Sequence, residues 1–197
     1  MLSPAHQLKQ FIQAIQKLDD EVLDAFIENW QPFECKRKTV LTAAGETERY
    51  LYFVLEGVQR SFYIGGHEKQ EATIIFTYPY SFSGVADSFL TRLPSFCFFE
   101  TLTASKFLRL PYASLEMLMQ QYPAILQTIL KATSLTLHGV LKRQVELQCF
   151  SAEEKYKTLF TRSPHLLQMI PHKYLASYLG IDASTFSKLL GTVKITS

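Results

Sequence analysis

The spacing of apolar residues changes along the chain, and each change predicts a different kind of secondary structure. Between residues 5 and 29 apolar side chains recur three and four positions apart, which predicts two short helices. From Trp30 to about Pro111 the pattern shifts to short runs rich in β-branched and aromatic residues, separated by turn signals such as Gly45 and Gly57. The clearest runs are 50–55, 59–64, 72–78 and 96–102. Several short strands spaced in this way predict a jelly roll or β-sandwich.

A long amphipathic segment follows the β-rich region. After a short helical piece, no proline interrupts the chain between Pro123 and Phe150, and the apolar spacing there predicts one helix over 124–150. Its stripe alternates four and three positions apart, as in a coiled-coil seam. The stripe consists of Leu126, Leu130, Thr133, Leu137, Val140, Gln144 and Leu147. We interpret this segment as a dimerisation helix, the alternative being a helix that packs only on its own β-domain.

The last quarter of the chain has the pattern of a helix-turn-helix. Ser151 and Glu154 form a capping box that predicts a new helix and a domain boundary near 149–151. Residues 170–190 then predict two short helices, because each half carries one apolar stripe on either side of Gly180. Glycine can adopt the positive φ of a sharp turn, and Asp182 is a good N-cap for the second helix. A β-wing after the motif is expected to be absent or reduced to 193–195.

A helix-turn-helix with a polar outer face is typical of proteins that read DNA. The residues predicted to face DNA are Ala183, Ser184, Ser187 and Lys188 on the second helix, with Thr185, His172 and Lys173 placed to contact phosphates. Charge favours this reading, because residues 151–197 carry six Lys/Arg against three Asp/Glu, whereas residues 1–150 carry 14 against 15. A plain helical hairpin with a solvated basic face is the alternative.

Composition excludes several other classes of protein. The 197 residues are 47% apolar, yet no uninterrupted apolar run approaches the roughly 18 residues that span a bilayer. The first residues lack a basic start followed by an apolar core, so we expect a cytoplasmic protein without a membrane segment. Three distant cysteines argue against a disulfide framework, and no His or Cys pair has metal-ligand spacing, so no metal is expected. His67 with its neighbouring glutamates is interpreted as a polar hairpin tip.

The order of these segments resembles the CRP/FNR family of bacterial transcription regulators, over nearly the whole chain. The residues that carry the resemblance are Ala44-Gly-Glu46, Tyr50-Leu-Tyr-Phe-Val-Leu-Glu-Gly57, Phe82-Ser-Gly84 and Leu175-Ala-Ser-Tyr-Leu-Gly-Ile181. The resemblance implies an α+β fold with a jelly-roll effector domain at 1–122, a dimerisation helix at 123–150 and a DNA-binding domain at 151–197. It also implies double-stranded DNA, a second copy of the chain, RNA polymerase and a small-molecule effector as partners, and no enzymatic activity.

The effector pocket that the resemblance implies departs from the pattern that binds cyclic AMP. Members that bind this nucleotide hold its ribose and phosphate with a Gly-Glu-Leu triplet and a later Arg-Ser or Arg-Thr pair. Here the triplet is Gly84-Val85-Ala86 and the pair is Ser95-Phe96. Without the glutamate and the arginine a buried phosphate would be nearly unpaired, unless Arg92 or Arg60 replaced them. We therefore expect no tight binding of cyclic AMP, and no other cofactor is predicted.

Residue content also bears on the other branches of the family and on other functions. The iron–sulfur branch needs cysteines clustered near the N-terminus, and the first 34 residues contain none. The haem-sensing branch stays open, although His6 and His67 give no specific reason to propose it. Members of the cyclic-AMP type carry Arg and Glu where this chain has Ala183 and Ser184, so a different operator is expected. The alternatives are a ligand-independent DNA binder with a scaffold β-roll, or a cupin-like carrier or enzyme.

Overall fold

The computed structural model describes residues 2–65 and 70–193, and the chain separates into two compact units. The first unit comprises residues 1–61 and 76–136, and the second comprises 62–75 and 137–197. The long helix and one β-hairpin each run from one unit into the other. The hairpin tip at His67 and most of the predicted wing at 193–195 lie outside the described residues. The division into three predicted domains therefore stays a prediction beside these two units.

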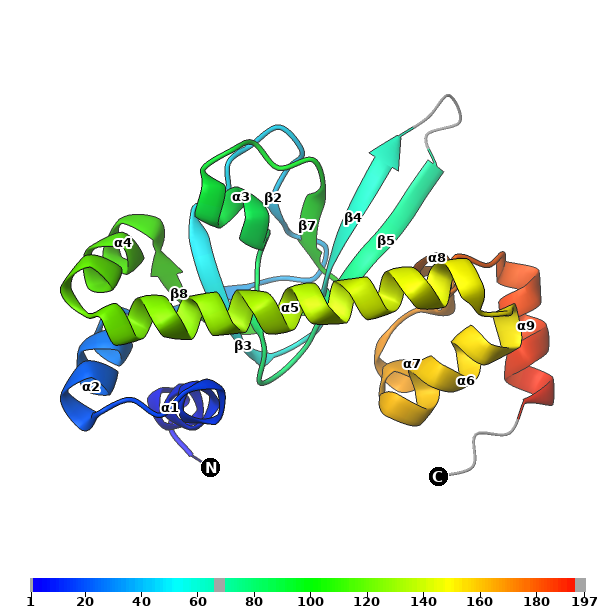
Figure 1. The fold of residues 1–197 in the computed structure, drawn as a ribbon. Helices are drawn as coiled ribbons and strands as arrows, with labels where there is room; N and C mark the ends of the chain where they lie inside the picture. The colour runs from blue at the N-terminus through cyan, green and yellow to red at the C-terminus, as the bar shows by residue number, and fades with distance from the viewer. Residues whose placement is uncertain (1, 66–69, 194–197) are drawn as a thin grey trace. The chain divides into compact units, whose positions relative to one another are not determined.

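Two four-stranded sheets form the β-roll, as the sequence predicts (Figure 1). Their strand orders are β1-β8-β3-β6 and β2-β7-β4-β5. The strands are β1 (Gln31–Cys35), β2 (Val40–Thr42), β3 (Tyr50–Glu56), β4 (Gln59–Gly65), β5 (Gln70–Thr77), β6 (Phe82–Ser83), β7 (Phe98–Thr101) and β8 (Ser105–Pro111). The pairs β1–β8, β2–β7, β3–β6 and β3–β8 are antiparallel, with Tyr52 opposite Arg109 and Val54 opposite Phe107.

The first sheet is buried on both faces, because successive residues of a strand point to opposite sides. Tyr52, Val54 and Phe107 face the second sheet and pack with Phe99 in an inter-sheet core. Phe53 of β3, together with Leu108 and Leu110 of β8, belongs to a second core formed with the surrounding helices. Those helices are α1 (Pro4–Ile15), α2 (Asp20–Glu28), α3 (Ala86–Thr91), α4 (Tyr112–Gln121) and the start of α5 (Pro123–Cys149).

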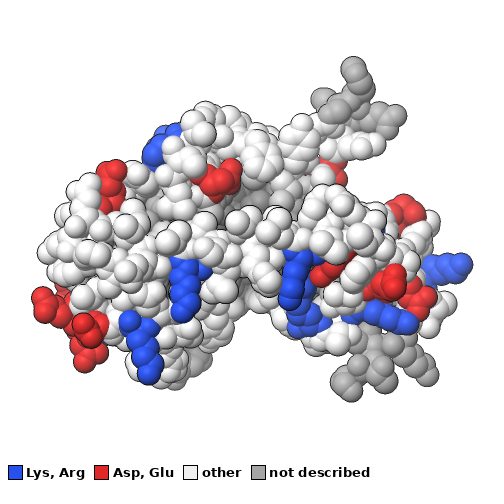
Figure 2. Space-filling model, in the orientation of Figure 1, with Lys and Arg blue, Asp and Glu red and all other residues white. Residues whose placement is uncertain are grey.

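Helix α5 confirms the predicted long helix and exposes most of the predicted seam. Its first turns bury Ile125 and Ile129. The seam residues are exposed, at 51% for Leu126, 65% for Leu130, 56% for Leu137 and 50% for Val140, and Thr133 is exposed as well. The surface along α5 is mostly uncharged on the face that Figure 2 displays. Among the described residues α5 is also the helix whose length and composition suffice to cross a membrane.

The second unit contains the C-terminal helices that the sequence predicts. They are α6 (Ala152–Arg162), α7 (Leu166–Met169), α8 (His172–Leu179) and α9 (Ala183–Thr192). The predicted capping box is present, because Ser151 Oγ accepts a hydrogen bond from the Glu154 amide while Glu154 accepts one from the Ser151 amide. Tyr156 and Phe160 of α6 pack against Phe186 of α9, with ring centroids 5.7 and 6.2 Å away. An aromatic core thus holds the three longer helices together.

Some elements of the first unit carry too weak a sequence signal to be predicted. Strand β1 contains a proline, β2 has only three residues, and β6 has two. Helix α3 is six residues long and follows Gly84 without a side-chain cap. Periodicity needs several repeats to be visible, so elements this short are defined by their neighbours in the fold.

Candidate nucleic-acid interface and effector site

Helices α8 and α9 meet at a turn whose geometry follows from two residues. Gly180 ends α8 with φ at 64°, the left-handed conformation that glycine adopts without strain. Asp182 caps α9, because its carboxylate accepts a hydrogen bond from the Thr185 amide at 2.8 Å. Hydrogen bonds from the hydroxyls of Ser184 and Thr185 lower the pKa of Asp182 further. Leu175 and Leu179 are buried beneath this turn, which fixes the angle between the two helices.

Most residues predicted to face DNA lie on the exposed side of α9, but only some have free side chains. Ala183, Ser184, Ser187 and Lys188 are all exposed. The hydroxyls of Ser184 and Thr185 donate to Asp182, so they serve the cap in this structure. The side chains of Ser187 and Lys188 make no hydrogen bond or ion pair with any described residue. These two side chains are therefore free to contact another molecule.

The two residues predicted to touch phosphates from α8 are exposed at its first turn. His172 lies with its ring centroid 5.3 Å from that of Phe186. Lys173 places its Nζ 4.6 Å from the ring centroid of Tyr174. Both side chains stand beside the start of the helix, where backbone amides point outward, an arrangement that suits contact with a phosphate.

A buried ionic network braces the helix-turn-helix against the C-terminal part of α5. Arg143 donates to Glu146 at 2.8 Å and to the carbonyl oxygen of Tyr178, and its guanidinium carbon lies 4.4 Å from the Tyr178 ring centroid. Arg162 of α6 adds a second cation 3.5 Å from Glu146. The side chains of Arg143 and Glu146 are about nine-tenths buried, at 10% and 9% exposure. α8 is thereby fixed to α5 within this unit.

Strand β5 contacts α8 through one hydroxyl group. Ser177 Oγ accepts a hydrogen bond from the Thr73 amide at 2.9 Å and donates one to the Glu71 carbonyl at 3.2 Å. β5 is the last strand of its sheet, so these bonds use polar groups at a sheet edge. The β-hairpin and the helix-turn-helix therefore share a direct polar contact within the second unit.

The turn before α3 holds a buried carboxylate that the sequence analysis did not single out. Gly84 has φ at 112°, and a Cβ there would lie 3.2 Å from the Tyr50 carbonyl oxygen. Glu48 is 1% exposed and accepts hydrogen bonds from the Val85 amide at 3.3 Å and the Thr42 hydroxyl at 2.7 Å. The amides of Arg49 and Tyr50 donate to its other oxygen. Burial nevertheless raises the pKa of Glu48.

The other residues predicted for the effector pocket do not converge on one cavity. Ser95 is buried, and its hydroxyl donates to the Cys97 carbonyl at 2.7 Å while accepting from the Cys97 amide at 3.1 Å. Phe96 is 59% exposed and Ala86 is exposed, whereas Val85 is buried in the inter-sheet core. The side chain of Phe96 is therefore largely open to solvent, and its place in an effector pocket stays a prediction.

The two arginines considered as substitutes are already engaged inside the first unit. Arg60 forms a buried ion pair with Glu100 at 2.7 Å. Arg92 donates to the Glu48 carbonyl at 2.7 Å, and its guanidinium carbon lies 4.2 Å from the Tyr112 ring centroid. Neither guanidinium is available to a phosphate without breaking these contacts, which supports the expectation that the family's usual ligand is not held here.

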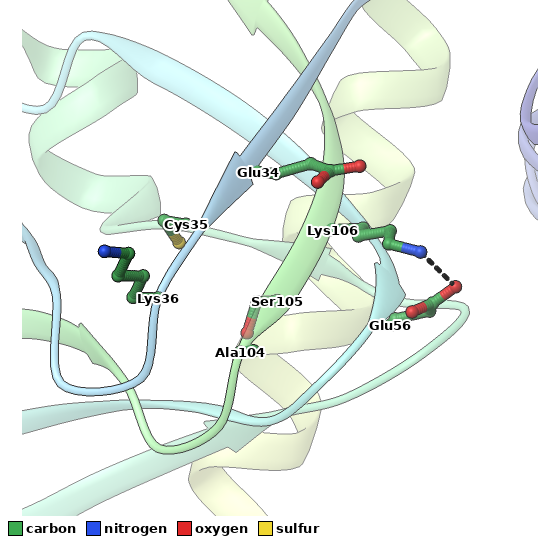
Figure 3. Close-up of a pocket in the computed structure, with 7 residues that line it drawn as sticks. All are labelled: Glu34, Cys35, Lys36, Glu56, Ala104, Ser105 and Lys106. Atoms are coloured by element: carbon green, nitrogen blue, oxygen red, sulfur yellow. Dashed lines mark hydrogen bonds and ion pairs between the residues drawn. The ribbon is translucent and has the colours of Figure 1, made fainter.

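Two hollows lie in the first unit, and Ala86 is the predicted pocket residue that lines one of them. One, of about 70 Å³, is lined mainly by apolar side chains of α3, α4, α5 and the first sheet, among them Phe82, Phe89 and Ile129. The other, of about 330 Å³, is open and is drawn in Figure 3. Its Lys106 and Glu56 pair with each other at 3.1 Å, and burial raises the pKa of the Cys35 thiol. Neither hollow combines a free charge with a reactive group.

Comparisons with known proteins were made for both sequence and structure. No protein-family model matches the sequence, and no curated protein matches it. FixK2 from Bradyrhizobium japonicum has a TM-score of 0.75 at 16% identity, over 82% of this chain and 83% of its own. The catabolite activator protein of Thermus thermophilus has a TM-score of 0.57 at 20% identity, over 99% and 91%.

A third similar structure is described as a member of the CRP/FNR family. It is a protein of Eubacterium rectale assigned to the CRP/FNR family of transcriptional regulators, with a TM-score of 0.70 at 13% identity, over 92% of this chain and 86% of its own. Identities this low leave the arrangement of the elements as the shared property. That arrangement, a β-roll, a long helix and terminal helices in the same order, gives this chain the fold of the CRP/FNR regulators.

Proposed function

We propose that this protein is a homodimeric transcription regulator that reads double-stranded DNA with α9. The observation that carries the proposal is the turn between α8 and α9, where Gly180 and Asp182 set up a helix whose outer face bears Ser187 and Lys188. The exposed seam of α5 supports the dimer, because Leu126, Leu130 and Leu137 are each more than half exposed. Two copies would present their recognition helices to successive major grooves, about 34 Å apart.

On this proposal the protein has no catalytic role, and it works in the cytoplasm beside the chromosome. Contact with RNA polymerase stays a prediction from the resemblance. Ser187 is suited to several bases, and Lys188 to guanine or phosphate, so the preferred operator should differ from one read by a pair of arginines.

Selection of bound sequences from random DNA tests the proposal directly. At two salt concentrations the full chain should enrich one palindromic motif, because sequence-specific contacts survive when phosphate contacts weaken. Lys188→Gln should bind the selected site about tenfold more weakly or worse, whereas Lys131→Gln, at an exposed position on α5, should bind normally. Retention that depends only on salt, with no enriched motif, would contradict a role in sequence-specific regulation.

We also propose that the β-roll does not bind cyclic AMP. Glu48 supports this, because its carboxylate already accepts the Val85 amide and would repel a nearby phosphate. The self-contained hydrogen bonds of Ser95 point the same way. Titration calorimetry of the full chain should give no saturable heat up to about 1 mM nucleotide. Any binding free energy would then be no more favourable than about −4 kcal/mol. A dissociation constant in the micromolar range would overturn this part of the proposal.

A second candidate function keeps DNA binding and omits the effector. Val85 favours it, because its side chain fills the inter-sheet core beside the predicted pocket. In this version the β-roll is a scaffold that holds α5 in position for dimerisation. A screen of metabolites by thermal shift discriminates the two, since one specific stabilising compound that also changes DNA affinity would exclude the scaffold version.

A further inference from the structure

Arg109 lies on the inner face of the first sheet, between two aromatic rings. It is central in β8, where its neighbours across the sheet are Gln31 and Tyr52. Its guanidinium carbon lies 4.4 Å from the Phe33 ring centroid and 4.5 Å from that of Tyr50. Both faces of the guanidinium plane are therefore covered by rings, and only the edge of the plane remains available for hydrogen bonds.

Unlike Arg60 and Arg92, Arg109 makes no hydrogen bond or ion pair with any described residue. Its Nε is buried and makes no hydrogen bond. Arg60 pairs with Glu100, and Arg92 donates to backbone carbonyls. Glu48, a buried acid just before β3, forms no ion pair with Arg109, and its carboxylate accepts from the Thr42 hydroxyl and three amides. A buried N–H donor of a cation without an acceptor is costly, so this site is incomplete as it stands.

The chemistry of the missing partner follows from the guanidinium geometry. The Nε–H and the adjacent Nη–H form a planar fork that matches the two oxygens of a carboxylate or phosphate. Partly buried rings of Phe33 and Tyr50 border this edge, and the inter-sheet core lies behind them. An anionic head group with an apolar or aromatic body would satisfy the fork and cover the rings together.

We propose that Arg109 anchors the carboxylate or phosphate group of a small organic anion at the edge of the inter-sheet core. The identification of this anion as an effector rests on the proposed function. Binding of the anion at Arg109 does not require DNA. The site adjoins the Gly84 turn, because a Cβ at Gly84 would lie 3.2 Å from the carbonyl oxygen of Tyr50, whose ring lies against Arg109. It uses an arginine of β8, whereas the resemblance places the family's phosphate-binding arginine at the position of Ser95.

Titration of the full chain with simple probes tests the site. Benzoate and phenyl phosphate distinguish a carboxylate from a phosphate, and inorganic phosphate serves as the anion without an apolar body. The Arg109 Nε–H signal in a ¹⁵N NMR spectrum should shift saturably with one of the two aromatic probes, and more weakly with inorganic phosphate. Arg109→Met should weaken binding by about tenfold or more, because the charge-assisted fork is lost. Arg37→Met, at an exposed arginine of the same unit, should bind as the wild type does.

Three outcomes would overturn the inference. They are shifts that stay linear with all probes, equal binding by Arg109→Met and the wild type, and equal loss in Arg37→Met. Arg109→Lys keeps the charge without the fork, so it should also bind weakly, and it provides a second variant if the methionine variant does not fold. Probe binding is measured without DNA, so a protein that selects an operator but ignores all probes would refute the anion site alone.

Discussion

Buried charged side chains organise both units of this protein at the scale of single residues. Glu48 accepts hydrogen bonds from one hydroxyl and three amides around the turn before α3, so these donors find their acceptor inside the protein. Arg143 does the same for the end of α8, where it binds a carbonyl and a carboxylate at once. Such groups tolerate burial because most of their polar atoms are hydrogen-bonded, although the Nε of Arg143 has no partner among the described residues.

Glu48 should make the stability of the first unit depend on pH. Burial raises its folded-state pKa above the ordinary value of 4.5, so the folded protein binds this proton more tightly than the unfolded chain does. The stabilisation from protonating Glu48 is thus complete below the unfolded pKa and is lost as pH rises through the folded pKa. In urea unfolding, the stability of the wild type relative to Glu48→Gln should fall as pH rises above the ordinary glutamate value of 4.5. A difference that does not change with pH would contradict this assignment.

Arg143→Met should release α8 from α5. The substitution keeps most of the side-chain volume but leaves Glu146 with only the longer Arg162 contact at 3.5 Å. Breaking one partner of a buried pair costs about 3 kcal/mol, which should appear as faster hydrogen exchange at the amides of α8. Lys142→Met, at an exposed position on the same helix, is the matched control. Equal exchange in the two variants would show that the network does not brace α8.

At the scale of elements, caps and glycine turns decide where the helices begin and end. The capping box at Ser151 separates α6 from α5, although the apolar pattern continues almost without a gap. Gly180 and Asp182 then place α8 and α9 at the angle their shared core requires. These are local devices, so they leave signals in the sequence that need no knowledge of the fold.

Two glycines of the second unit should respond to alanine in opposite directions. Gly180→Ala should lower stability by about 1 kcal/mol, because a side chain there must adopt a positive φ. Its Cβ would also lie 3.2 Å from Leu147 Cδ2. Gly139→Ala, inside α5 with nothing within 4 Å of the new Cβ, should raise stability by up to about 1 kcal/mol. Thermal melts followed by circular dichroism measure both, and a neutral Gly180→Ala would argue against the strained turn.

At the scale of the whole molecule, the unpartnered face of α5 is the feature that most needs a second chain. Leucines in mid-helix stay exposed even though the helix starts in a well-packed core. A second copy of the helix would cover them in the way a coiled coil does, and would bring two recognition helices together. The proposed reading of a palindrome depends on this pairing.

Leu137→Asp should dissociate the dimer, because it places a charge in the proposed seam. Leu135 stands two positions earlier, about 200° away around the helix, and so lies on the opposite face. Its exposure of 57% against 56% for Leu137 makes Leu135→Asp a close control. Sedimentation should show a dimer dissociation constant at least about 100-fold higher for Leu137→Asp alone. Dimers of equal strength in both variants would place the interface elsewhere.

The order of the elements and the turn at Gly180 could be predicted because periodicity, caps and turn residues act over a few neighbouring positions. The same local signals identified α5, its seam and the exposed face of α9. Short elements such as β6 and α3 were not predictable, since two or six residues show no period. The effector pocket was predicted by position only, and of its residues Val85 and Ser95 are buried whereas Phe96 is exposed.

By itself, therefore, the sequence determined a β-roll, a long helix and a helix-turn-helix, in that order. Tertiary structure alone decided the partners of the buried charges. Glu48 meets Val85 from 37 positions away, Arg143 meets Tyr178 from 35, and Arg109 reaches rings on two other strands. Such contacts depend on how distant strands and helices pack, and no local pattern distinguishes a glutamate or arginine that will be buried from one that stays in solvent.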